Sequence, residues 1–103
     1  MIVTTQERVE HRTISQTLGV VSGQSIRARH VGKDILASFR NLVGGEIIEY
    51  SKLMAESREQ AMDRMKVHAT ELGADAIVGV RFTTSMLQQG ASEIFIYGTA
   101  VKL

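Results

Sequence analysis

The C-terminal strand of this chain constrains its fold most, because it is apolar on both faces. Residues 92–103 have the composition of a β-strand, in which successive side chains point to opposite faces of the sheet. Both faces carry apolar residues: Ile94 and Ile96 on one, Phe95, Tyr97 and Val101 on the other. An antiparallel sheet with one solvated face alternates apolar and polar side chains. We therefore expect both faces of this strand to be covered.

The remaining apolar pattern predicts a single α+β domain over residues 1–103. In chain order we expect a strand over about 13–27, a short helix over about 31–43, a long helix over about 47–72, and a strand over about 75–86. The predicted fold is a two-layer β-α-β-β subunit, in which an antiparallel three-stranded sheet packs on the long helix. Residues 2–5 are a further short, β-branched segment at the N-terminus.

Glycines divide these elements, since the chain contains no proline. We expect a bend or bulge near Gly19 or Gly23 in the first long strand. Gly44-Gly45 ends the short helix, and Gly73 takes the C′ position after the long one. Along the strand over about 75–86, the even-numbered apolar residues are expected to share one face. These are Ala76, Val78, Val80 and Phe82.

The two-faced strand predicts self-assembly. One helical layer covers only one face of a small sheet, and the pattern provides no second layer for Phe95, Tyr97 and Val101. We expect another copy of the chain to cover that face. Two alternatives remain open: a hairpin that simply exposes a few apolar side chains, or residues 2–5 folding back over the face.

Composition excludes several classes of function. The chain has no Cys, which removes disulfides, zinc–thiolate sites and thiol catalysis. Its net charge is +1 and no basic stripe alternates with aromatic residues, so we expect no nucleic-acid partner. No apolar run approaches the roughly 20 residues that span a bilayer. The N-terminus lacks the pattern of a signal peptide, so a cytoplasmic location and no membrane partner are expected.

Several motifs together give the chain a family resemblance. They are Gly19-Val-Val-Ser-Gly23, Arg40-Asn-Leu-Val-Gly-Gly45, Tyr50, Arg58, Leu72-Gly-Ala-Asp-Ala-Ile-Val-Gly79 and Gly98-Thr-Ala-Val101. With these motifs the chain resembles the YbjQ-like family over about residues 15–102. That family carries a heavy-metal-binding label.

The resemblance implies a subunit with a dodecin-like fold. It also implies a ring assembly, a homopentamer in which extra short strands help to hold the subunits together. Residues 2–5 would then be such an oligomerisation strand. The resemblance implies no established biochemical function.

The sequence gives little support to the heavy-metal-binding label of the family, because it lacks the ligands that such metals prefer. Soft metals prefer clustered thiolates and imidazoles, whereas Cys is absent and His11, His30 and His68 are far apart. His30 with Asp34 and His68 with Glu71 are pairs at helical spacing, and each would supply two ligands. A ring could bring such pairs together. Pairs of this kind are also common on helix surfaces, so we assign no metal ligands and no cofactor.

The Gly44-Gly45 turn before the long helix is a candidate anion site. Free backbone N–H groups and the helix dipole favour negative charge at such a place. Arg40 and Arg58 would supply guanidinium donors and Tyr50 a hydroxyl. The alternative is structural: the glycines reverse the chain between two helices, the arginines pair with carboxylates, and Tyr50 packs.

No residue pattern indicates catalysis. No Ser lies in a nucleophile-elbow sequence, and Glu46 and Glu49 lie near a helix start, where carboxylates are favoured in any case. Flavin stacking would need a large aromatic, and Trp is absent. The sequence therefore favours a non-catalytic ring that binds a small ligand or a protein. The alternatives are a heavy-metal-binding protein that uses His and carboxylate ligands and, more distantly, an enzyme acting on an anionic small molecule.

Overall fold

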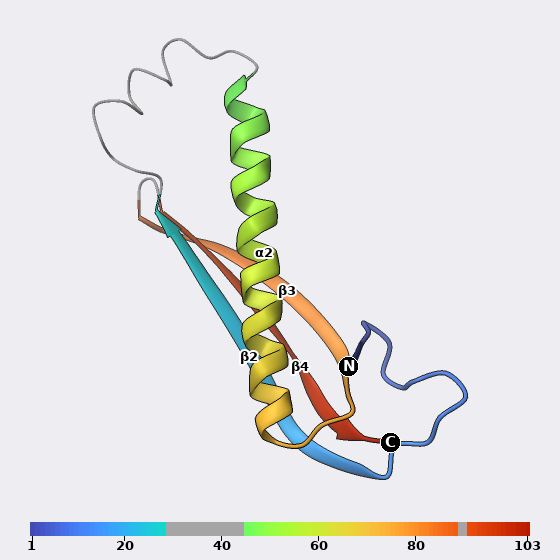
Figure 1. The fold of residues 1–103 in the computed structure, drawn as a ribbon. Coiled ribbons are helices and arrows are strands. Elements are labelled where there is room, and N and C mark those ends of the chain that lie inside the picture. Colours follow the sequence, from blue (N-terminus) through green and yellow to red (C-terminus); the bar gives the residue numbers. More distant parts are fainter. Residues whose placement is uncertain (29–44, 89–90) are drawn as a thin grey trace.

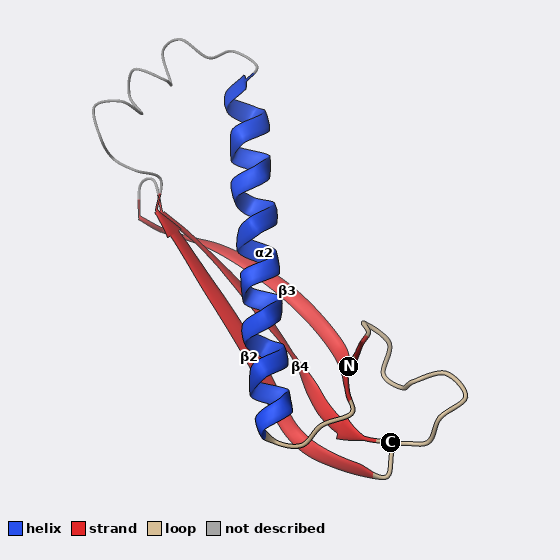
Figure 2. Cartoon of the chain, in the orientation of Figure 1, coloured by secondary structure: helices blue, strands red, loops and turns tan. Residues whose placement is uncertain are grey.

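A computed structural model describes residues 1–28, 45–88 and 91–103 of the chain. Its elements in chain order are β1 (Ile2–Val3), β2 (Gln16–Ala28), α2 (Gly45–Glu71), β3 (Ala76–Gln88) and β4 (Ala91–Lys102). Figure 1 shows α2 crossing one face of a sheet formed by the strands, and Figure 2 shows the two layers by type. The two-layer α+β prediction is confirmed, whereas the expected helix over 31–43 lies outside the described residues.

The sheet has four strands and is mixed, in the order β1-β3-β4-β2. β4 pairs antiparallel with β2 and β3, as predicted, but β1 adds a parallel strand to the outer edge of β3. The expected three-stranded antiparallel sheet is therefore incomplete. The N-terminal segment continues along β3, where Val80 N–H donates to the Thr4 carbonyl at 3.1 Å. Residues 2–5 thus serve the sheet of their own chain, because they satisfy backbone groups at an otherwise bare edge.

α2 ends at the residues that the sequence indicates. Gly73 has a φ of 80°, a left-handed conformation that suits glycine. Its N–H donates to the Thr70 carbonyl at 2.9 Å, and the next N–H, that of Ala74, donates to the Ala69 carbonyl at 3.0 Å. This pair of hydrogen bonds is a Schellman motif, so the predicted C′ role of Gly73 is confirmed. No helix within the described residues is long and apolar enough to cross a membrane.

The main core lies between α2 and the sheet. Its buried side chains come from all the long elements: Val21, Ala61, Met65, Ala69, Ile77, Val80, Ile94, Ile96 and Ala100. Ile94 and Ile96 therefore face the helix. The sequence had placed these two residues together on one apolar face of β4 that needs a cover. β2 approaches α2 most closely at Gly23, where an added Cβ would lie 2.6 Å from the Met65 backbone nitrogen.

Bulges break the alternation that the sequence pattern suggests. The pairing of β3 with β4 shifts between Val78 and Arg81, and Gly79 has a φ of 63°. An extra residue in one strand reverses which parity faces the helix. Val80 accordingly joins the main core, whereas Val78 faces the other side, so the expectation that both share a face was wrong. A similar shift beside Gly19 confirms the bulge predicted in β2.

A second, smaller core covers one end of the sheet face that is turned away from α2. Its buried members are Val9, Ala76, Val78 and Val101, with Ile14 and Leu103 packed against them. Val9 and Ile14 belong to the segment between β1 and β2, which loops around this end of the molecule (Figure 1). The expectation that the chain has nothing to cover Val101 was therefore wrong: its own N-terminal segment does so.

Candidate functional site

Beyond the second core, the residues that the structure describes place no further layer over the sheet surface away from α2. We call this surface the open face and define it by Val20, Ile26, Phe95 and Tyr97. Val20 is 71% exposed, and Ile26 and Tyr97 are also exposed. The Phe95 and Tyr97 rings lie side by side, with centroids 5.7 Å apart. The sequence predicted that Phe95 and Tyr97 need a cover, and the described residues cover these two side chains only in part.

β3 carries a second apolar margin beside α2. Phe82 pairs with Ile96 and Met86 with Ser92, so both lie on the helix side of the sheet. The helix packs mainly on β2 and β4, and Met86 is left 77% exposed. The N-terminal segment ends its pairing at Val80, so within the described residues the outer edge of β3 from Arg81 onward has no partner strand. We call Phe82, Met86 and this edge the β3 margin.

The outer edge of β2 is different, because side chains of α2 reach across it. The Ser22 N–H donates to Nδ1 of His68 at 3.3 Å. Arg64 Nη1 donates to the Gln24 carbonyl at 2.6 Å. These bonds depend on the close approach at Gly23, which lies between the two strand residues. Natural sheets protect their edges in this way against pairing with other chains.

A polar cluster lies between β2 and α2, on the C-terminal side of Gly23 along β2. Its two serines are buried, and its Arg27 and Gln60 are partly buried. Ser25 Oγ donates to Oε1 of Gln60 at 2.8 Å, and Arg27 Nη2 donates to the same oxygen at 3.0 Å. Ser57 is buried one helical turn before Gln60. Two atoms of this cluster, Ser57 Oγ and Arg27 Nε, are buried without a hydrogen-bond partner in the part of the chain that the structure describes. We call Ser25, Arg27, Ser57 and Gln60 the buried polar cluster.

Sequence reasoning missed this cluster, although a signal existed. Ser57 interrupts the apolar stripe of α2, since it lies between Met54 and Ala61 at helical spacing. Ser25 and Arg27 share the parity of Val21 and are therefore on the helix-facing side of β2. Polar residues on both facing surfaces indicate a shared buried site, but only the pairing of β2 with α2 shows that they meet.

The anion site predicted from the sequence is only partly within the described residues. Arg40 and Gly44 lie outside them, and Gly45 begins α2. Tyr50 belongs to the first two turns of the helix, whereas Arg58 is exposed further along it. A helix rises about 1.5 Å per residue, so Arg58 lies roughly 20 Å along the axis from Gly45. Within one chain, Arg58 therefore does not lie at the N-terminus of α2, where the anion was expected to bind. The anion site stays a prediction.

Comparison with known proteins gives the family of the chain. Residues 1–103 match the YbjQ family, which is described as "Putative heavy-metal-binding". The chain belongs to the YbjQ family. A UPF0145 protein of Archaeoglobus fulgidus is 53% identical over 103 residues, covering 100% of this chain and 95% of the relative. A UPF0145 protein of Photobacterium profundum is 50% identical over 103 residues, covering 100% of both chains.

One solved structure shares the fold of this YbjQ-family chain. It is a protein of unknown function from Pediococcus pentosaceus, assigned to the DUF74 family, with a TM-score of 0.68. The match covers 100% of this chain and 97% of the other, at 20% sequence identity. At that identity the likeness shows the fold alone. The family match over residues 1–103 and the relatives at 50% identity or more confirm the family resemblance drawn from the sequence motifs.

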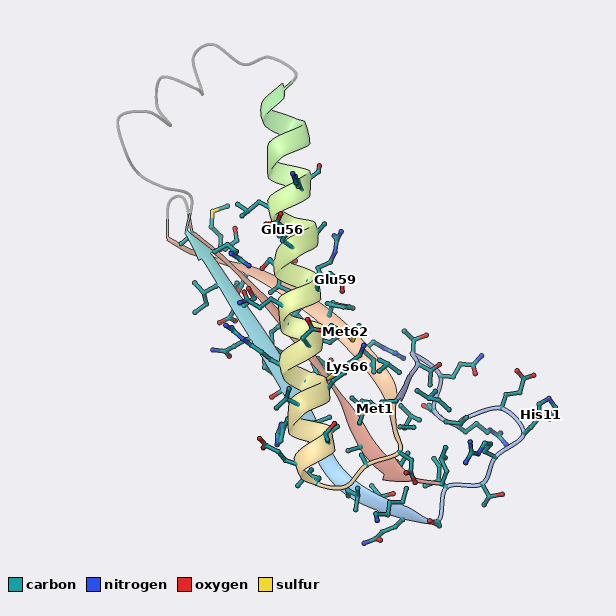
Figure 3. The ribbon with its side chains drawn as sticks, in the orientation of Figure 1. Met1, His11, Glu56, Glu59, Met62 and Lys66 are labelled. Atoms are coloured by element: carbon teal, nitrogen blue, oxygen red, sulfur yellow. The ribbon has the colours of Figure 1, made fainter. Side chains whose placement is uncertain are left out.

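The metal label of the YbjQ family would require His, Asp or Glu ligands here, since the chain has no Cys. Within the described residues, no group of three or more His, Asp or Glu side chains lies together. His11 lies at the tip of the segment before β2, away from the labelled residues of α2 (Figure 3). His68 already uses Nδ1 as an acceptor for the Ser22 N–H, which leaves its proton on Nε2. His30 and Asp34 lie outside the described residues.

Proposed function

We propose that this chain is the subunit of a cytoplasmic homo-oligomeric ring, a homopentamer, that acts as a non-catalytic binding module. The observation that supports assembly most is the open face. An apolar surface that joins Val20, Ile26, Phe95 and Tyr97 marks an interaction site more often than an ordinary surface. Because no second layer within the described residues covers all of it, a second copy is the simplest cover.

The shape of the chain also favours assembly. It measures 55 × 22 × 17 Å, with a radius of gyration of 17.2 Å. A compact domain of this length has a radius of gyration of about 13 Å. Long strands and one long helix give the extended form, and such a shape buries less of its own surface than a compact one. Contact with neighbouring copies would recover that burial.

The two edges of the sheet favour a head-to-tail ring over a symmetric dimer. The β3 margin offers unpaired backbone and exposed apolar side chains, whereas the β2 edge is occupied at Ser22 and Gln24 by α2. Unlike surfaces pair heterologously, and a heterologous contact closes into a ring when its rotation allows. The number five comes from the family resemblance.

Native mass measurement tests this proposal. At micromolar concentration the protein should have a mass that is a multiple of the 11.3 kDa chain, and we expect five copies. Sedimentation at several concentrations should show one dominant species. A stable monomer under these conditions would contradict the proposal.

A further inference from the structure

We propose that the buried polar cluster binds a small oxyanion, a phosphate or carboxylate group, between β2 and α2. Within the described residues, Arg27 Nε and Ser57 Oγ are donors of the cluster without a hydrogen-bond partner, while Gln60 and Ser25 hold the arrangement in place. The site lies inside a single subunit. This proposal names the class of ligand that the proposed binding module takes. It can be tested separately from ring assembly, because the site does not depend on a second subunit.

Arg27 presents one edge of its guanidinium to the cluster. Nη2 donates to Gln60 Oε1 at 3.0 Å, and Nε, which lies on the same edge, is buried without a partner in the described residues. This edge of Arg is one that carboxylates and phosphates bind with two parallel hydrogen bonds. A ligand oxygen beside Nε would complete the pair.

Gln60 cannot supply the missing acceptor, because its oxygen is already used twice. Oε1 accepts from Ser25 Oγ at 2.8 Å and from Arg27 Nη2. An amide oxygen has two lone pairs, so both are taken. Gln60 therefore fixes the position of Arg27 and leaves Arg27 Nε to another acceptor.

Ser57 adds a second donor, one helical turn before Gln60 on α2. It is 1% exposed, and its Oγ has no partner within the described residues. Positions 57 and 60 are adjacent on one helix face, and Gln60 is the residue that contacts Arg27. A buried hydroxyl left without a partner destabilises the folded state, so an occupant that accepts its hydrogen bond is favoured.

Charge distinguishes an oxyanion from a water molecule at this place. A buried water would accept both hydrogen bonds but carries no charge, whereas an oxyanion also pairs with the guanidinium of Arg27, which is partly buried. Among the described residues, the ion pair recorded joins Glu10 to His11 at 3.8 Å, in the segment between β1 and β2. An oxyanion satisfies both donors and neutralises Arg27 together.

The test uses the full-length protein at constant ionic strength. Thermal unfolding and calorimetric titration are run with inorganic phosphate, with acetate and with chloride as the control. A ligand of the native state raises its stability, so we expect a saturable rise in Tm with phosphate or acetate beyond that with chloride. The two oxyanions separate a phosphate site from a carboxylate site. A response to neither, relative to chloride, overturns the proposal.

Two variants locate the effect. Ser57→Ala and Arg27→Lys should each weaken oxyanion binding by about tenfold or more, since each removes a hydrogen bond to a charged group. Arg64→Gln is the matched control: it removes a positive charge from the same helix–strand contact but outside the cluster, and binding should persist. Binding that is equal in Ser57→Ala, Arg27→Lys and the parent protein would overturn the assignment.

Ser57→Ala also separates the proposal from a buried water. In chloride alone this variant should be as stable as the parent protein or more stable, because it removes an unpaired hydroxyl and adds a better helix former. Its mass and circular dichroism show whether it folds. If the variant is clearly less stable in chloride, the hydroxyl already has a partner, and the proposed oxyanion site is wrong.

Discussion

The backbone of Gly23 lies against the backbone of Met65, with 2.6 Å between the Met65 nitrogen and the position that a Cβ at residue 23 would take. This contact sets the distance between β2 and α2. On either side of Gly23 along the strand, His68 and Arg64 reach the outer edge of β2 at Ser22 and Gln24. Beyond this contact, the buried polar cluster forms where the strand and the helix continue side by side.

Gly23→Ala should therefore destabilise the protein strongly. The added methyl group meets backbone atoms that cannot rotate away, so strand and helix must separate. Overpacking of a core typically costs about 1–3 kcal/mol, and we expect the upper part of this range. Denaturant unfolding at one protein concentration measures it. Gln24→Ala, at an exposed neighbouring position, is the control and should change little; equal stability of Gly23→Ala and Gln24→Ala would contradict the close contact.

Val9→Ala tests the cover that the N-terminal segment provides over Val101. Val9 is buried in the second core, so losing two methyl groups should reduce the free energy of unfolding by about 1.5 kcal/mol. The Gly79 and Val80 N–H groups, which donate to the carbonyls of Gln6 and Thr4, should exchange faster with solvent. The same substitution at Val67, which is 58% exposed on α2, should stay within about 0.5 kcal/mol. Equal losses for the two variants would argue against the packing of Val9.

His68→Ala should open the outer edge of β2. The variant leaves the Ser22 N–H without its acceptor, at a cost of about 1 kcal/mol. Amide exchange at Ser22 should accelerate more than at residues that pair with β4. His11→Ala, in the exposed segment before β2, should leave both the stability and this exchange rate unchanged. If Ser22 exchanges at the parent rate in His68→Ala, the hydrogen bond does not protect the edge.

Tyr97→Lys tests whether copies meet at the open face. The new charge would stand beside Arg81, its cross-strand neighbour, and would have to be buried in any contact there. We expect assembly to weaken by at least about tenfold, with the monomer still folded by circular dichroism. Sedimentation measures the change. Val67→Lys introduces the same charge on the far side of α2 and should assemble normally; dissociation of this control together with Tyr97→Lys would place the contact elsewhere.

Much of the fold follows from local pattern. The helical stripe predicted α2 to within about two residues at each end, a usual margin for such boundaries. Gly73 marked its end because only a left-handed residue completes the Schellman motif. The two faces of β4 were also predictable, and Ile94 and Ile96 are buried against α2. The family could be recognised from motifs alone, and the match over residues 1–103 confirms it.

Non-local contacts were not predictable in the same way. The side of the sheet that Val80 joins depends on the bulge at Gly79, and a bulge is defined by the partner strand. The parallel pairing of β1 with β3 joins residues more than seventy positions apart. The candidate site likewise depends on two elements. Ser57 interrupts a helix stripe, but Arg27 reaches Gln60, one turn further along the helix, only because β2 packs on α2.

The sequence by itself determined which segments are helix and strand and which faces are apolar, because those properties depend on neighbours along the chain. Only the tertiary structure decided that the N-terminal segment covers Val101 and that Arg27, Ser57 and Gln60 share one buried site. The reason is physical: burial and hydrogen bonding between distant residues depend on how the elements are placed in space, and backbone contact at Gly23 fixes that placement for β2 and α2.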